Sequence, residues 1–252
     1  MGIRKGLKKY LLEKGFCCER GGKTFFQPRG DGFYVCVELH CERRPAYQIE
    51  PNHWREIEAP FYDVRFDILC LNERCMEVLK LSLPYMTRQK YLSDVGCLSS
   101  LCRVCGKQKQ DWIKYQGSDE TRIQREIIDA FEQEVYIPLF EAKDFSLYDY
   151  LCRVALNLGE EISYNSPTLF EAACHERRWK DARYCLRCTI AQRSSLLDAY
   201  GYDSVLQHPR SLQQLETYLT DDMIADLVNS EDPHDRYILE LYRDIEGRIN
   251  RP

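Results

Sequence analysis

The sequence lacks the signatures that assign a chain to most well-defined classes. Its 252 residues contain no run of about eighteen apolar residues, so no segment is predicted to cross a membrane. It has no Asn-x-Ser/Thr acceptor and no Gly-x-Gly-x-x-Gly, Walker A or Gly-x-Ser-x-Gly motif. The five histidines are scattered and form no His-Glu-x-x-His pair. No motif therefore points to dinucleotide, P-loop or α/β-hydrolase chemistry.

An excess of positive charge is also missing. The net charge is −5, and the contents of 44% hydrophobic and 30% charged residues are those of an ordinary globular protein. Residues 1–30 carry eight basic and two acidic side chains, whereas residues 211–246 carry ten acidic and two basic ones. We expect no non-specific nucleic-acid binding. Either the two ends attract each other, or each presents a face of its own sign to a partner.

Cysteine, in contrast, is abundant, with thirteen residues. The basic N-terminus is followed by no apolar segment, so we expect no signal peptide. The cysteine count is odd and the chain is much longer than disulfide-stapled secreted domains. We therefore predict a cytoplasmic protein whose cysteines are free thiols or metal ligands.

The hydrophobic periodicity predicts an α+β fold in two domains. Residues 1–118 are expected to form a helix, ending at Gly15, and an antiparallel β-meander whose first turn is Gly21-Gly22. Strands are predicted over 33–40 and 62–68, joined by a loop that contains Pro45, Pro51 and Pro60. Further elements are predicted over Val78 to Leu83, as a strand, and Asp111 to Tyr115.

Residues 119–252 are expected to form a helical domain packed on the first. A helical hairpin is predicted over 168–200 with Trp179 at its turn, and a last helix from Pro233 to Ile249 after Asp232. Glu171 is expected to complete a capping box. The predicted N-caps are Ser118, Asp144, Thr220 and Thr168, the last of which is the partner of Glu171 in the capping box.

Five cysteines occur at spacings that bind metals in other proteins: Cys97, Cys102, Cys105, Cys185 and Cys188. The first three have the spacing of plant-type ferredoxin ligands, but no fourth thiolate is close in sequence. A structural zinc site formed by the triple with one or both of Cys185 and Cys188 is the better metal hypothesis, and it would make the protein a zinc-stabilised scaffold. The favoured interpretation is that the thiols pack as small apolar side chains and that no cofactor is bound.

Two other pairs, Cys36/Cys41 and Cys70/Cys75, lie in or beside predicted strands. Residues five apart on a strand point to opposite faces, so neither pair is expected to meet.

A divalent-metal hydrolase, loosely similar to metal-dependent nucleases, is the enzymatic alternative. It would use Asp31, Glu38 and His40, which follow one another on a turn and a strand. Asp63 and Asp67 alternate with Val64 and Phe66, and we expect them on a solvated strand face.

Several short motifs resemble the bacterial family called domain of unknown function 4304, over about residues 3–156. That family has a helix, a meander with a glycine and aromatic run, a tryptophan segment and a helix leading into a proline motif. The matching segments here are Gly15-Phe16, Gly22-x-Thr24-Phe25-Phe26, Asp111-Trp112-Ile113, Ile137-Pro138-Leu139-Phe140 and Ser146 to Leu151. The family has no characterised activity, so the resemblance implies no catalytic residues. Some families of this kind look like immunity proteins that neutralise toxins by binding them.

The leading hypothesis is a non-enzymatic protein-binding module, possibly similar to immunity proteins. Seventeen tyrosines favour recognition, because tyrosine is enriched at protein interfaces. A basic protein partner is expected to contact an acidic group of four residues. This acidic group comprises Glu216, Asp221, Asp222 and Asp226.

Overall fold

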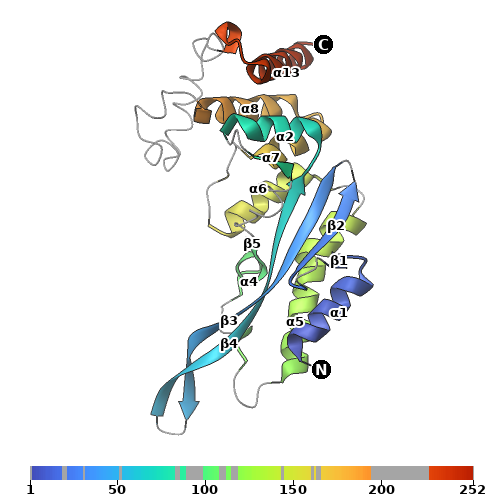
Figure 1. The fold of residues 1–252 in the computed structure, drawn as a ribbon. Helices are drawn as coiled ribbons and strands as arrows, with labels where there is room; N and C mark the ends of the chain where they lie inside the picture. The colour runs from blue at the N-terminus through green and yellow to red at the C-terminus, as the bar shows by residue number, and fades with distance from the viewer. Residues whose placement is uncertain are drawn as a thin grey trace. The chain divides into compact units, whose positions relative to one another are not determined.

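The computed structural model confirms an α+β protein with an N-terminal helix, a five-stranded antiparallel sheet and a mainly helical remainder (Figure 1). The described residues are 2–18, 22–30, 32–50, 53–82, 86–88, 99–107, 112–114, 119–142, 145–159, 162, 166–193 and 227–251.

The sheet is a meander in which each strand pairs with its neighbours in the sequence. The first hairpin pairs Cys17 with Phe26, and the next pairs Thr24 with Glu38. Gly22 has φ +68°, a left-handed conformation that glycine adopts without strain, as a glycine turn requires. Gly21, the other residue of the predicted turn, lies outside the described residues. The strands are β1 (Cys17–Cys18), β2 (Thr24–Gly30), β3 (Phe33–Glu50), β4 (His53–Cys70) and β5 (Ser99–Ser100).

The alternating apolar residues of β3 form part of the core beneath the sheet, as predicted. Phe33, Val35 and Val37 are buried, and helix α1 (Ile3–Glu13) packs on β3 and on α5 (Glu120–Phe131). Gly15, with φ +92°, follows the end of α1 as expected. Sequence periodicity alone was therefore sufficient to predict this layer.

The expected proline loop between the two long strands is wrong. Pro45 lies within β3 and Pro60 within β4, so the two strands form one long hairpin (Figure 1). Pro45 lies beyond Glu38, the last β3 residue in register with β2. Proline is tolerated there because a strand edge without a partner needs no amide donor.

The strand expected from Val78 to Leu83 is also wrong, because residues 78–82 belong to α2 (Glu73–Ser82). Leu83 lies outside the described residues. Its buried residues Cys75, Met76, Val78 and Leu79 recur at i, i+1, i+3 and i+4, which is a helical pattern. Asn72 caps the helix, since its side-chain oxygen accepts a hydrogen bond from the Cys75 amide at 2.7 Å.

The later helices confirm the helical hairpin and the last helix. Two N-caps differ from those predicted: Asp119 caps α5 instead of Ser118, and Ser166 caps α7 instead of Thr168. In α7 Pro167 occupies the first helical position, so the cap is the residue before it, Ser166. The remaining elements are α4 (Leu101–Val104), the π-helix η2 (Glu132–Glu141), α6 (Leu147–Asn157), α7 (Pro167–His175), α8 (Trp179–Arg193) and α13 (Pro233–Ile249).

The chain forms two compact units. Unit 1 comprises Met1–Leu69, Val95–Phe145 and Arg153–Glu160, and unit 2 comprises Cys70–Asp94, Ser146–Cys152 and Glu161–Pro252. Each unit has its own buried apolar core. Within the described ranges, no helix is long and apolar enough to cross a membrane.

Candidate functional site

Asp63 is buried in unit 1, with 2% of its surface exposed, and not on a solvated face as expected. The short strand β5 pairs with β4 beside it and covers this position. The carboxylate accepts hydrogen bonds from Ser100 Oγ at 2.6 Å, Cys102 N at 3.1 Å and Val64 N at 2.9 Å. Burial raises the pKa of Asp63, and these three bonds oppose the increase. The acid thus holds the cysteine-bearing segment against β4.

Cys102 and Cys105 lie in different environments. Cys102 is fully buried, and its thiol donates to the carbonyl oxygen of Lys107 at 3.6 Å. Burial raises the pKa of Cys105 to about 12, and the nearby charges of Glu134 and Asp63 add to the effect. Metal binding requires thiolates, so the raised pKa of Cys105 disfavours it. Cys97, the third member of the predicted group, lies outside the described residues.

Cys185 and Cys188 lie on α8 in unit 2 and are buried beside Ala182, as expected of packed thiols. Burial raises the pKa of Cys185 well above its usual value. Over the part of the chain that the structure describes, no cluster of three or more His, Cys, Asp or Glu side chains could hold a metal ion. The zinc site that would join these residues to the earlier triple stays a prediction.

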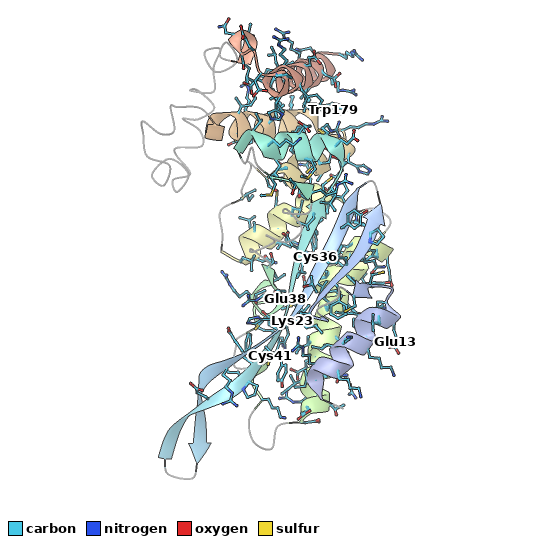
Figure 2. The ribbon with its side chains drawn as sticks, viewed as in Figure 1. Glu13, Lys23, Cys36, Glu38, Cys41 and Trp179 are labelled. Atoms are coloured by element: carbon cyan, nitrogen blue, oxygen red, sulfur yellow. The ribbon has the colours of Figure 1, made fainter. Side chains whose placement is uncertain are left out.

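The hydrolase candidates in the described residues are Glu38, which Figure 2 labels, and His40. They lie two residues apart on β3 and therefore share one face of the strand. The Nε2 atom of His40 lies 3.0 Å from an Arg65 guanidinium nitrogen and 3.1 Å from a carboxylate oxygen of Glu42. The imidazole is therefore part of a cross-strand ion cluster. Asp31, the third candidate, lies outside the described residues.

Asp67 lies two residues further along the same face of β4 as Arg65 and is half-buried. Its Oδ1 atom accepts a hydrogen bond from the Ile68 amide at 2.7 Å. Loss of hydration raises the pKa of Asp67 to about 7, and the Ile68 hydrogen bond opposes this only in part.

A thiol pair in unit 2 is the group that sequence reasoning missed. Cys70 is the last residue of β4 and Cys75 lies in the first turn of α2, and both are fully buried. Interaction with the Cys75 side chain lowers the pKa of Cys70, and interaction with Cys70 raises the pKa of Cys75. The expectation that these residues point to opposite strand faces is wrong, because the chain leaves the strand between them. The helix cap at Asn72 was the sequence signal that could have shown this.

Next to this pair, Arg74 forms a two-point ion pair with Glu171, which is 4% exposed. Arg74 Nε donates to Glu171 Oε2 at 2.8 Å, and the bond to Glu171 raises the pKa of Arg74. Glu171 thus joins α7 to α2 and does not complete the predicted capping box. A partnered carboxylate is needed here, because an unpaired buried charge is strongly destabilising.

The predicted acidic group (Glu216, Asp221, Asp222 and Asp226) lies outside the described residues. Comparisons with protein-family models, curated proteins and solved structures gave no significant match. The resemblance to domain of unknown function 4304 therefore stays a prediction.

The raised pKa of Asp67 predicts a pH-dependent stability. The unfolded carboxyl titrates near 3.8 and the folded one near 7, so the folded chain binds more protons between these values. The free energy of unfolding should therefore fall as pH rises from about 4 to about 7. In urea unfolding across this pH range, the free energy of unfolding of Asp67→Asn should change less with pH than that of the wild type. The exposed control Glu240→Gln should keep the wild-type slope, and an unchanged slope in Asp67→Asn would refute the assignment.

Elemental analysis of the purified chain tests the packed-thiol interpretation. We expect well below one zinc per chain, because the Cys102 thiol donates a hydrogen bond to a backbone carbonyl and burial raises the pKa of Cys105. The contrary result is one zinc per chain that is lost in Cys102→Ser and retained in Cys17→Ser, an exposed control.

Proposed function

We propose that this protein is a non-enzymatic protein-binding module similar to immunity proteins. The observation that carries the proposal is the outer face of α1. Lys5, Lys8, Lys9, Leu12 and Glu13 line a shallow groove of about 430 Å³, and Leu12 is 46% exposed. A single exposed leucine is ordinary on a protein surface, so the proposal rests on the positive charge of the three lysines, which would complement an acidic protein partner.

The structural roles of the buried acids support the same conclusion. Asp63 binds backbone amides, and Glu171 pairs with Arg74. Glu176 accepts hydrogen bonds from Ser146 Oγ at 2.7 Å and from the Tyr148 amide at 3.1 Å, and thus holds the start of α6. Each of these carboxylates stabilises the scaffold of its own unit. No observation in the described residues favours the hydrolase over a binding role.

The proposed partner surfaces have opposite signs. The groove on α1 is basic, whereas the acidic group is the predicted contact for a basic partner. Charge complementarity at such surfaces affects mainly the rate of association and the choice of partner. Variants of each surface can therefore identify the sign of the partner.

Co-expression with the products of the adjacent genes, followed by calorimetry of any complex, tests the proposal. Neutralising the acidic group with Glu216→Gln, Asp221→Asn, Asp222→Asn and Asp226→Asn should weaken the binding of a basic partner by about tenfold or more. The matched control is the double variant Glu231→Gln and Glu240→Gln. Both acids are exposed; Glu231 precedes α13, and Glu240 lies within it.

An acidic partner should instead lose affinity when Lys5 and Lys9 are changed to Glu. Binding that is unaffected by both sets of variants would refute the surfaces proposed here. If no product of a flanking gene binds, the immunity-like form of the proposal fails.

A further inference from the structure

The ammonium group of Lys14 lies among aromatic rings in unit 1. Its Nζ atom is 4.3 Å from the centroid of the Tyr136 ring and 5.7 Å from that of the Tyr10 ring. Both distances are within the range of cation–π attraction. The same nitrogen lies 2.7 Å from Oε1 of Glu132. Tyr10, Tyr136 and Glu132 thus form a site for a cation, which we call the ammonium cage.

Other aromatic side chains hold the two rings of the ammonium cage in place. Phe140 lies against Tyr136 with ring centroids 5.1 Å apart and planes at 32°. Tyr10 makes an edge-to-face contact with Phe131 at 6.2 Å, and Phe131 is buried in the core of the unit. Aromatic pairs in these arrangements attract each other beyond the effect of burial. Ring contacts that do not involve Lys14 therefore support the geometry of the cage.

Two members of the ammonium cage belong to the π-helix η2. At the end of this helix the Ala142 amide donates to the Ile137 carbonyl oxygen, five residues earlier, at 3.0 Å. Glu132, Tyr136 and Phe140 follow one another at intervals of four residues, so they lie on one face of the helix. π-Helical segments are rare and often occur at functional sites. The element that presents the carboxylate and the closer ring is therefore of an unusual kind.

The charges around the ammonium cage favour a cation. The bond to Glu132 raises the pKa of Lys14 although burial opposes this, and the charge of Glu141 adds to the increase. The same bond lowers the pKa of Glu132. Burial and the charge of Glu132 raise the pKa of the Tyr10 hydroxyl. The cage thus stabilises a positive charge and disfavours a second negative one.

Lys14 can leave the ammonium cage without a change in the backbone. It is the C-cap residue of α1, and 28% of its side chain is exposed. Its ammonium group is strongly hydrated and is carried on a flexible four-carbon stem. A quaternary ammonium group, in contrast, cannot donate hydrogen bonds, and aromatic cages recognise it through their ring faces. Such a group can therefore compete with Lys14 for the two rings.

We propose that the ammonium cage is a binding site for a trimethylammonium group and that Lys14 is its intramolecular competitor. The methyl groups contact the faces of Tyr10 and Tyr136, and the carboxylate of Glu132 balances the charge. Lys14 moves into water when the ligand enters. The proposal does not depend on the protein-binding function, because a small cation is sufficient to test it.

Calorimetric titration of Lys14→Ala with choline tests the proposal. Removal of Lys14 takes away the competitor, so choline should bind this variant at least about tenfold more tightly than it binds the wild type. Dimethylbutanol, in which carbon replaces the nitrogen of choline, should bind neither protein. The matched control is Lys23→Ala, which removes an exposed lysine that precedes β2 (Figure 2) and should keep the wild-type affinity.

Cage variants in the Lys14→Ala background identify the site. Tyr136→Leu removes a ring face but keeps an apolar side chain, and Glu132→Gln removes only the charge. Each should weaken choline binding by about tenfold or more. The acetylated amide of trimethyllysine is titrated in parallel. Tighter binding of choline would indicate a free small cation as the ligand, and tighter binding of the amide would indicate a methylated lysine side chain.

The proposal is overturned if folded Lys14→Ala binds choline no more tightly than the wild type, or if dimethylbutanol binds it as tightly as choline. If Lys14→Ala does not fold, NMR of the wild-type protein with isotope-labelled lysine gives the deciding result. A high concentration of choline should shift the ε-methylene resonance of Lys14, which lies near the rings, and leave that of Lys23 unchanged. A Lys14 resonance that does not move would contradict the proposal.

Discussion

Asp63 is the constraint on which the organisation of unit 1 depends. Its carboxylate is buried in β4 and satisfies donors from β5 and α4, so one side chain joins the sheet to the segment that contains Cys102. Each buried donor left without a partner costs about 1–3 kcal/mol. An acid that is conspicuous in the sequence therefore serves the fold, and the same is true of Glu171 and Glu176 in unit 2.

The buried cysteines also differ from one another in their surroundings. Cys102, Cys185 and Cys188 fill buried positions, as small apolar side chains do. Cys70 and Cys75 are equally buried, and each shifts the pKa of the other. Spacing in the sequence drew attention to the first group, whereas the second became apparent only from the structure.

Local patterns predicted the fold class, the alternation of β3, the glycine turn and α13, because each depends on neighbours in the sequence. The errors occurred where contacts between segments distant in the sequence determine the local structure or the burial of a residue. Pro45 and Pro60 are typical of loops in the sequence, but the structure places them within β3 and β4. The local pattern predicts a solvated position for Asp63, but the pairing of β5 with β4 covers it. Of the candidate sites, the packing of Cys185 was predictable from its helix, but the ion pair of Glu171 with Arg74 was not.

Unfolding of Asp63→Ala in urea tests most directly whether the buried acids belong to the scaffold. The account predicts a loss of about 3 kcal/mol in the free energy of unfolding, because three donors lose their acceptor. Asp63→Asn should lose less than half as much, since its side-chain oxygen can still accept from Val64 and Cys102. A change within about 0.5 kcal/mol of wild type for Asp63→Ala would contradict the account.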